Sequence, residues 1–534
     1  MIYQRDVEIP VRDGAVLRAN LYRPVDGTPA PVVMTFGPYG KDLHMSELHN
    51  SAYVKLEEQG ALLNWETPNP EWWVPAGYAV LRVDQRGSGT SPGVFDPFSE
   101  TQSQDYYDAI EWAAVQPWST GKVGLVGVSY YAMSQWQVAA LNPPHLMAMI
   151  PWEGAADVYR DFCRHGGILN NGFIESWWPV FALKTQHGAE KAGGHLSPEE
   201  LAANRVDLLE SARSHPLYDE HYRRSLPDPS TIQVPFLSVG NWGAFTLHLR
   251  GNVEAFVRAQ SKHKWLRIHT GNHFEPYHTE ASRLLQKRFL DYWLKGEDTG
   301  VLADAPVQLA IRHGDGEVIW RDEQAWPLPG TEWTKLHLDA ANGSLGAEAP
   351  DSGAQATYEA PAGGVSFSTA PFDEATEITG PLALRLWVSS TAADMDVFAT
   401  VRNVDADGKD VWGVGSGGEP VAIAKGWLRV SHRALDAALS LPYRPYHPHD
   451  RADPVPPGEV VPVEVEVLPT SMVFEAGHRL VLDVEAHDGV GSGRGQHNDP
   501  TDRPAERFAG ENTLYTGPEH ESYLLVAVVP ARRA

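Results

Sequence analysis

The sequence predicts an α/β domain with a parallel sheet, followed by a domain built mainly of β-strands. In the first 300 residues, short apolar runs that suit buried strands alternate with segments that suit helices. This alternation is typical of βαβ units. Beyond about Val301 the texture changes to short alternating runs, such as residues 382–388 and 480–484, between turns rich in Gly, Pro and Asp. Such runs favour a β-sandwich or jelly roll.

The elements of the α/β part follow in order along the chain. Residues 7–22 alternate around the turn Asp13-Gly14, which predicts a β-hairpin. Helices are expected at about 103–115, 134–141 and 281–295. Apolar runs predict buried strands at residues 31–36, 78–84, 123–127, 147–150, 234–239 and 265–268.

A long segment interrupts this alternation. Between about Ala155 and Asp228 the chain is rich in Arg, His, Glu and Trp and has few strand signals, which predicts a helical insertion that acts as a lid. We therefore expect a core made of residues 1–154 and 231–300, a cap at 155–230 and a jelly-roll β domain at 301–534. Fold analogy suggests that a face of the β domain supports a homodimer.

Composition narrows the class of function. The chain has 534 residues, 43 Lys and Arg against 69 Asp and Glu, and a formal charge of −26. This excess of anions argues against binding to nucleic acid or to an anionic membrane surface. With Cys163 as the only cysteine, neither a disulfide framework nor a cysteine zinc site is expected. We expect a cytoplasmic protein, since we find no signal peptide and no run of 18 apolar residues. We also expect no cofactor and no metal.

The most informative motif is Gly127-Val128-Ser129-Tyr130-Tyr131. An apolar strand runs into a turn with a serine at its apex, and a helix follows, which is the context of a nucleophile elbow. The motif matches only in part, because Tyr131 stands where the G-x-S-x-G pattern has its last glycine. An ordinary turn serine is the alternative on this stretch alone.

Further segments carry a resemblance that covers nearly the whole chain. Together with the elbow, they are similar to the cocaine esterase and X-Pro dipeptidyl-peptidase family of serine hydrolases (CocE/NonD type). That resemblance implies an α/β-hydrolase core, a helical cap and a C-terminal jelly roll. The matching segments, in order, are residues 9–14 and 21–24, the P-Y-G-K run 38–41, residues 77–80, the D-x-R-G-x-G-x-S-x-G run 84–93, residues 127–130, and residues 474–480.

The resemblance also implies roles for individual residues. Ser129 would be the nucleophile, while the Tyr39 hydroxyl and the Tyr130 backbone N–H would form the oxyanion hole. The general base would be a histidine in a loop after a late strand. His273 is best placed, in Gly271-Asn272-His273, and His278 is its competitor. Trp152, with Trp177 and Trp178 of the insertion, is predicted to line the substrate pocket; packing within the lid is the alternative for the last two.

The acid is where the chain departs from the family. Gly243 stands where the family has an aspartate, in Gly240-Asn241-Trp242-Gly243. Either the acid is missing or it comes from another strand end, because a triad is defined by geometry. We predict Glu153, just after the strand at 147–150. Asp157 and Glu275 are rivals, and a structural carboxylate paired with Arg160 or Arg164 is the alternative.

Three functions follow from these residues. The first is a serine hydrolase that cleaves an ester, or less readily an amide or peptide, of a small molecule through an acyl-Ser129 intermediate. The second is an acyltransferase that passes the same acyl group to an amine or alcohol under a lid that excludes water. The third, motivated by Gly243, is an inactive binding protein with the same fold.

Overall fold

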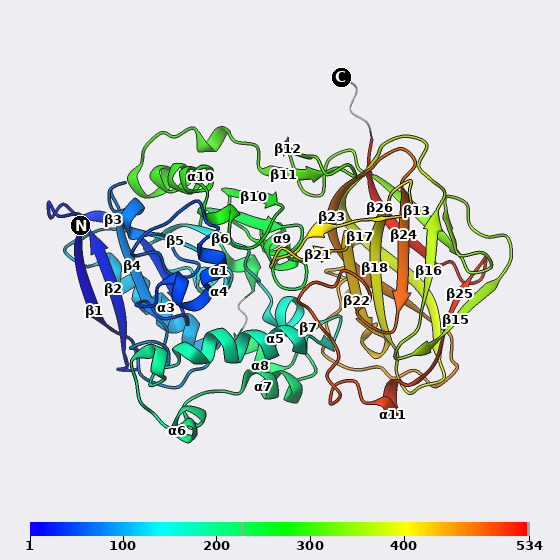
Figure 1. Ribbon diagram of the computed structural model, residues 1–534, viewed down its shortest axis with the longest axis horizontal. Coiled ribbons are helices and arrows are strands. Elements are labelled where there is room, and N and C mark those ends of the chain that lie inside the picture. Colours follow the sequence, from blue (N-terminus) through cyan, green and yellow to red (C-terminus); the bar gives the residue numbers. More distant parts are fainter. Residues whose placement is uncertain (226–227, 531–534) are drawn as a thin grey trace.

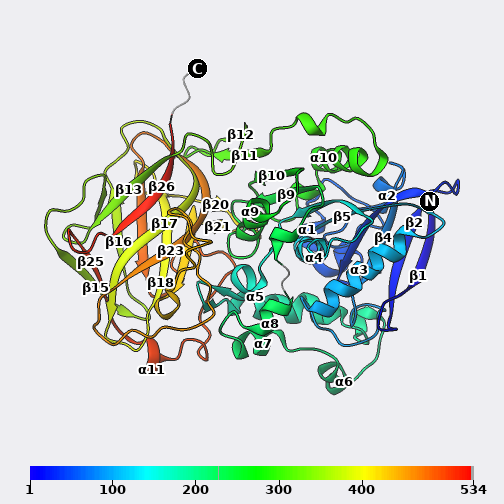
Figure 2. The ribbon, with the colours of Figure 1, turned by 180° about the vertical axis from the view of Figure 1, so that it is seen from behind.

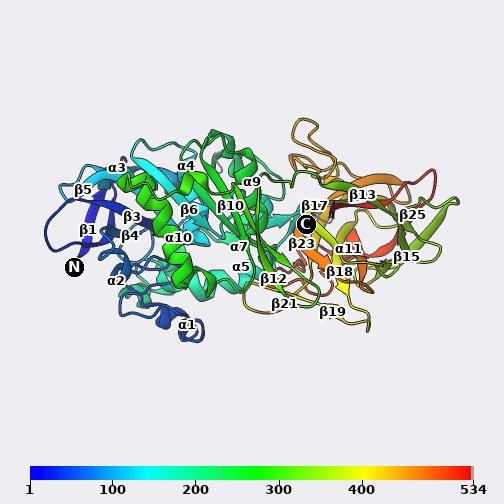
Figure 3. The same cartoon turned by 90° about the horizontal axis from the view of Figure 1, so that it is seen from above.

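The computed structural model describes residues 1–225 and 228–530. It consists of an α/β part and a β domain that lie end to end along the long axis (Figures 1 and 3). Within the described residues, no helix is both long and apolar enough to cross a membrane.

The α/β part is built on one mixed sheet. Its strand order is β1-β2-β4-β3-β5-β6-β9-β10-β11-β12, and the pairs from β4–β3 through β10–β11 are parallel. The predicted hairpin is present as β1 and β2, and the six predicted buried strands are present as β3 to β6, β9 and β10. The strands are β1 (Ile2–Pro10), β2 (Val16–Arg23), β3 (Ala30–Gly37), β4 (Ala79–Asp84), β5 (Ser119–Val128), β6 (Leu146–Trp152), β9 (Phe236–Asn241), β10 (Lys264–His269), β11 (Val307–Arg312) and β12 (Val318–Glu323).

The last two strands of this sheet lie beyond the expected boundary between the core and the β domain. β11 pairs with β10 and β12 pairs with β11, so the core sheet continues to Glu323, past the expected end at residue 300. β11 and β12 form an antiparallel pair joined by a short turn, which has the same local texture as the strands of the β domain, so the sequence alone does not assign them to the core sheet.

Helices cover both faces of the sheet. On one face α3, α4 and α9 share a core with Leu125 of β5; α3 lies in front of the strands in Figure 2. On the other face α2, α10 and the π-helical turn η7 pack with Val126. Their bounds are α1 (Met45–Tyr53), α2 (Pro70–Trp73), α3 (Glu100–Ala114), α4 (Tyr130–Ala139), α9 (Leu249–Arg258), α10 (Glu280–Leu290) and η7 (Asp291–Lys295), with short 3₁₀ turns η6 (Pro276–His278) and η8 (Val301–Ala303).

The insertion after β6 is mainly helical, as its sequence predicts. Its helices α5 to α8 lie along the lower edge of the α/β part in Figure 1. The elements are η1 (Val158–Cys163), β7 (Arg164–His165), β8 (Ile168–Leu169), α5 (Asn171–Trp177), η2 (Trp178–Ala182), η3 (Leu183–Thr185), η4 (Glu190–Ala192), α6 (Pro198–Ala203), α7 (Leu208–Ser214), α8 (Glu220–Ser225) and η5 (Pro229–Thr231).

The C-terminal part is the expected β domain. Among the described residues, nine strands in the order β17-β23-β22-β18-β24-β16-β14-β13-β26 close into a ring, because β26 pairs with both β13 and β17. β15 and β25 extend the sheet from β17, and β20 and β21 form a separate pair. The elements are β13 (Glu332–Asp339), β14 (Ser344–Gly346), β15 (Ala354–Ala360), β16 (Gly364–Thr369), β17 (Thr376–Ser390), β18 (Asp396–Val404), β19 (Asp410–Val411), β20 (Gly413–Val414), β21 (Pro420–Val421), β22 (Ala424–Arg429), η9 (Val430–His432), β23 (Val461–Phe474), β24 (Arg479–Glu485), α11 (Ala505–Phe508), β25 (Gly510–Thr516) and β26 (Tyr523–Val529).

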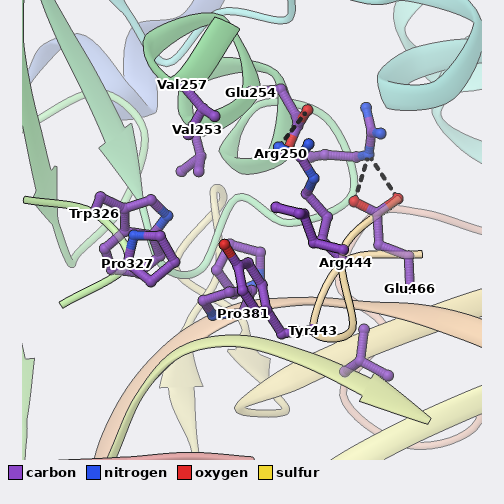
Figure 4. Close-up of a pocket in the computed structure, with 13 residues that line it drawn as sticks. Arg250, Val253, Glu254, Val257, Trp326, Pro327, Pro381, Tyr443, Arg444 and Glu466 are labelled. Carbon is purple, nitrogen blue, oxygen red and sulfur yellow. Dashed lines mark hydrogen bonds and ion pairs between the residues drawn. The ribbon is translucent and has the colours of Figure 1, made fainter. Parts of the chain in front are cut away.

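Ion pairs join the two parts. A small cavity of about 40 Å³ lies between α9 and the β domain (Figure 4). Beside it Arg250 contacts Glu466 at 2.9 Å and Arg444 contacts Glu254 at 3.0 Å. Because these charged side chains pair with each other, we interpret the cavity as part of the packing between domains.

Candidate active site

The turn at Ser129 has the geometry of a nucleophile elbow. β5 ends at Val128, α4 begins at Tyr130, and Ser129 between them has φ 58° and ψ −116°. This left-handed conformation is costly for a residue other than glycine, and such strain gathers at functional sites. The elbow lifts the serine to the carboxyl edge of the parallel strands, where ligands bind in α/β sheets.

The large Tyr131 fits the elbow because β3 makes room for it. A Cβ added to Gly37 would lie 2.6 Å from the Tyr131 ring, closer than side chains approach. The ring therefore occupies the space that a side chain at residue 37 would need. This explains how the chain keeps the turn without the last glycine of the motif.

His273 and Glu153 meet at the same edge. Glu153 directly follows β6, and His273 lies four residues after β10. Nδ1 of His273 donates a hydrogen bond of 2.7 Å to Oε2 of Glu153. Both side chains are buried, with the Glu153 residue fully inaccessible. A carboxylate on Nδ1 fixes the tautomer and orientation of a catalytic histidine.

Several groups hold Glu153 as a carboxylate. Its backbone has φ 46° and its N–H donates to the Val239 carbonyl at 2.7 Å. Oε1 accepts from Asn241 at 3.3 Å and lies 3.1 Å from Nε2 of His269. Burial would raise the pKa of Glu153, but His273 and His269 outweigh it and lower the pKa to about 2.

The structure gives His273 and Ser129 different partners. Nε2 of His273 lies 3.1 Å from Oε1 of Glu66, a buried residue in the loop between β3 and β4. Oγ of Ser129 lies 3.5 Å from Nε2 of His248, just before α9. The rings of His248 and His273 stack at 12°, with centroids 5.3 Å apart. The two imidazole rings are therefore stacked, and His248 is the one that contacts Ser129.

These contacts favour different protonation states for the two rings. Burial lowers the pKa of His273, but Glu153 and Glu66 outweigh it and raise the pKa to about 10. Burial and the neighbouring His273 lower the pKa of His248 to about 3. Burial raises the pKa of Glu66, against the opposing effect of His273. In this arrangement His273 is the cationic ring and His248 the neutral one.

A hairpin of the β domain explains the glycine at the family's aspartate position. A Cβ on Gly243 would lie 1.7 Å from the Val414 carbonyl oxygen of β20. The same hairpin accepts a hydrogen bond of 2.9 Å from the His273 N–H at Ser416. No side chain fits at residue 243 without moving this hairpin, so an aspartate there is sterically excluded.

Tyr39, predicted to donate its hydroxyl to an oxyanion hole, lies two residues after β3. Its hydroxyl oxygen accepts a hydrogen bond of 2.9 Å from Nε1 of Trp177, on α5 of the cap. Since a tyrosine hydroxyl also has one donor, its proton stays free for another acceptor. Burial, with the charge of Glu66, raises the pKa of Tyr39 well above its usual value, so the hydroxyl keeps that proton.

The other predicted pocket residues lie in different surroundings. Trp177 stacks on Tyr130, with ring centroids 6.1 Å apart, and so lies next to both Tyr130 and Tyr39. Trp178 stacks on Phe95 within the lid core. Trp152 is 1% exposed and packs against His269, behind the site. In this structure Trp152 supports the histidine–carboxylate cluster from the core side.

The rival residues have partners of their own. Asp157 pairs with Arg160 at 2.6 Å, and Glu275 accepts a hydrogen bond from Asn272 at 2.7 Å. His278 bonds Glu58 at 2.9 Å. Each of these pairs accounts for its residue without a role beside Ser129.

Sequence reasoning missed Glu66 and His248. Glu66 stands in Asn64-Trp65-Glu66-Thr67 and His248 in Thr246-Leu247-His248, and neither run matches a catalytic motif. The only usable signal for His248 was its place after a strand of the sheet. His248 reaches Ser129 and Glu66 reaches His273 through chain folding rather than through local spacing.

One group of side chains could hold a metal ion. Among the described residues, ligand atoms of His313, Asp315 and Glu475 lie within 4.8 Å of one another. Nδ1 of His313 already contacts Glu475 at 3.3 Å; His313 and Asp315 lie in the turn after β11, and Glu475 directly follows β23. It is separate from the residues around Ser129.

Comparisons with known proteins agree with this architecture. The model of the X-Pro dipeptidyl-peptidase (S15) family matches residues 13–275, and that of the X-Pro dipeptidyl-peptidase C-terminal non-catalytic domain matches residues 292–525. A crystal structure of a CocE/NonD family hydrolase from Staphylococcus aureus has a TM-score of 0.90 and 35% identity, over 99% of this chain and 94% of that one. This chain belongs to the CocE/NonD hydrolase family.

Curated relatives place this CocE/NonD hydrolase among serine hydrolases. The cocaine esterase of Rhodococcus sp. (strain MB1 Bresler) is 26% identical over 98% of both chains. A putative Xaa-Pro dipeptidyl-peptidase of Bacillus cereus is 23% identical over 59% of this chain and 56% of that protein. The protein is therefore an enzyme of a serine hydrolase family whose members act on esters or X-Pro dipeptides.

Proposed function

We propose that the protein hydrolyses a carboxylic ester of a small molecule through an acyl intermediate on Ser129. The hydrogen bond of 2.7 Å between His273 and Glu153, beside the strained elbow, carries this proposal. Similarity to an esterase along nearly the whole chain favours an ester over an amide. If Glu153 supplies the triad acid, the glycine at residue 243 does not deprive the site of a catalytic group. This argues against an inactive binding protein.

In the proposed reaction Ser129 attacks the ester carbonyl. Its proton passes to Nε2 of His273, and Glu153 stabilises the resulting imidazolium through Nδ1–H. His273 then returns the proton to the leaving alcohol. A water molecule attacks the acyl group by the same route, which releases the acid and restores Ser129.

Two donors would stabilise the oxyanion. Trp177 occupies one acceptor site of the Tyr39 hydroxyl, which leaves the phenolic proton to donate. The Tyr130 N–H is at the first turn of α4, where helix N–H groups lack partners within the helix. Each such donor is worth about 2.7–4 kcal/mol in the transition state.

The aromatic side chains near Tyr39 suggest an apolar group in the substrate. Trp177 contacts Tyr130, Phe162 and Phe173 as well as Tyr39. These rings belong to one buried apolar cluster beside the proposed oxyanion hole. We infer that the group bound there is small and apolar or aromatic.

The first test is intact mass after incubation with a fluorophosphonate. We expect a single adduct on the wild-type protein and none on Ser129→Ala, because only an activated serine reacts. Ser134→Ala is the matched control; this buried serine of α4 bonds the Phe36 carbonyl and should not affect labelling. An unlabelled wild type, or a labelled Ser129→Ala, would refute the proposed nucleophile.

A further inference from the structure

Both ring nitrogens of His273 face carboxylates. Nδ1 lies 2.7 Å from Glu153, and Nε2 lies 3.1 Å from Glu66. A general base must offer the lone pair of Nε2 to the serine hydroxyl. Here Nε2 is directed to Glu66, while the Ser129 hydroxyl lies beside His248. The resting arrangement therefore separates the base from the nucleophile.

Glu66 is anchored to the nucleophile elbow. Its carbonyl accepts a hydrogen bond of 3.1 Å from the Val128 N–H, one residue before Ser129. Its φ of 58° is strained for a glutamate, and such strain persists only where the surroundings hold it. The residue is 5% exposed. Its backbone is thus held beside the elbow, and its carboxylate is buried at the site.

The charged and titratable groups around His273 come from four elements. Glu66 faces it from the β3–β4 loop, Glu153 from the end of β6, and His248 from the turn before α9. His269 of β10 lies on the far side of Glu153. His248 is neutral, so the two carboxylates dominate, and an imidazolium between them is stabilised.

We propose that Glu66 is a positioning residue that holds protonated His273 away from Ser129 in the resting enzyme. This inference rests on the proposed function. For acylation, the Nε2 proton must first leave His273 for solvent, and the freed ring then turns to accept the proton of Ser129. Glu66 opposes the first step because a carboxylate at 3.1 Å favours the cation. It therefore sets the pH below which the enzyme is inactive.

The test is the rate of fluorophosphonate labelling of Ser129 across a pH series. The wild-type rate should fall on the acidic side as His273 is protonated. In Glu66→Gln we expect this fall to move to lower pH by about 1–3 units, the size of the shift that one neighbouring charge causes. The rate at high pH should stay at the wild-type level, since Glu153 still orients the ring.

Glu58→Gln is the matched control. Glu58 is as buried as Glu66, and it also pairs with a histidine, His278, at 2.9 Å. Its variant should keep the wild-type pH profile. Glu66→Asp keeps the charge but shortens its reach, so its profile should lie between those of wild type and Glu66→Gln. If Glu66→Gln shows no cooperative thermal transition and is therefore not folded, the pH profile of Glu66→Asp is the test.

The outcomes separate the two proposals. If the acidic limb of the labelling profile lies at the wild-type pH in both Glu66→Gln and Glu66→Asp, the positioning role of Glu66 is overturned. The proposed function is not affected by that result. Loss of labelling at every pH in Glu66→Gln would also overturn the positioning role, because Glu66 would then be required rather than restraining. An unlabelled wild type at every pH would overturn the proposed function, and this inference with it.

Discussion

At the scale of single residues, three strained positions define the site. Ser129, Glu153 and Glu66 have φ of 58°, 46° and 58°, in a region that side chains other than glycine rarely occupy. Strain of this kind costs of order 1–3 kcal/mol for each residue, so the surrounding contacts must hold it. Two of the three were predicted from sequence: Ser129 from its elbow motif and Glu153 from its strand end.

Glu153→Gln tests the relocated acid. The variant keeps the shape of the side chain but cannot hold the imidazolium, so we expect kcat for a p-nitrophenyl ester to fall by about 10⁴. Steady-state kinetics measure this. Glu275→Gln, which changes a carboxylate bonded to Asn272 instead, should retain activity. Turnover of Glu153→Gln within a few-fold of wild type would show that another residue is the acid.

At the scale of elements, the β20–β21 hairpin brings the β domain into contact with the candidate site. It accepts the N–H of His273 at Ser416 and packs its Val414 carbonyl on Gly243. Sequence comparison with the family detected the missing aspartate but not its cause. The cause lies about 170 residues further along the chain, in a contact that no local pattern encodes.

Gly243→Ala tests this contact. Its Cβ would overlap the Val414 carbonyl, which forces the hairpin to move and costs about 1–3 kcal/mol of unfolding free energy. Urea or thermal unfolding measures the loss, and activity should fall as the His273 loop shifts. Gly240→Ala is the matched control, because its nearest neighbour would be at 3.6 Å. Equal stability of the two variants would contradict the close packing of the hairpin.

At the scale of the whole molecule, buried ion pairs join the cap to the β domain. Asp502 of the β domain contacts Arg164 of the cap at 2.6 Å and Arg429 of β22 at 2.9 Å. Burial would raise the pKa of Asp502, but the two guanidinium groups outweigh it and hold the pKa far below its usual range. The carboxylate therefore stabilises the folded state wherever it is ionised.

Asp502→Asn should destabilise the protein by about 3–5 kcal/mol at neutral pH, because it leaves the buried Arg164 guanidinium without its ion-pair partner, while Arg429 keeps Asp396. Chemical unfolding measures the change. Asp407→Asn, at an 80% exposed side chain 3.8 Å from Lys409, should have no effect. The lowered pKa fixes the sign of the pH dependence: the contribution is complete above about pH 3.9 and is lost as the pH falls further. A difference between wild type and Asp502→Asn that grew in acid would contradict this assignment.

The sequence by itself determined the two-part architecture, the elbow at Ser129 and the strand ends that carry Glu153 and His273. These follow from apolar periodicity, turn residues and the rule that parallel strands present their carboxyl ends at one edge. Only the tertiary structure decided which groups contact Ser129 and His273. His248 and Glu66 reach them through long-range packing, and the hairpin that excludes a side chain at Gly243 comes from the other domain. Such contacts depend on how separate elements close on each other, so no local pattern of residues records them.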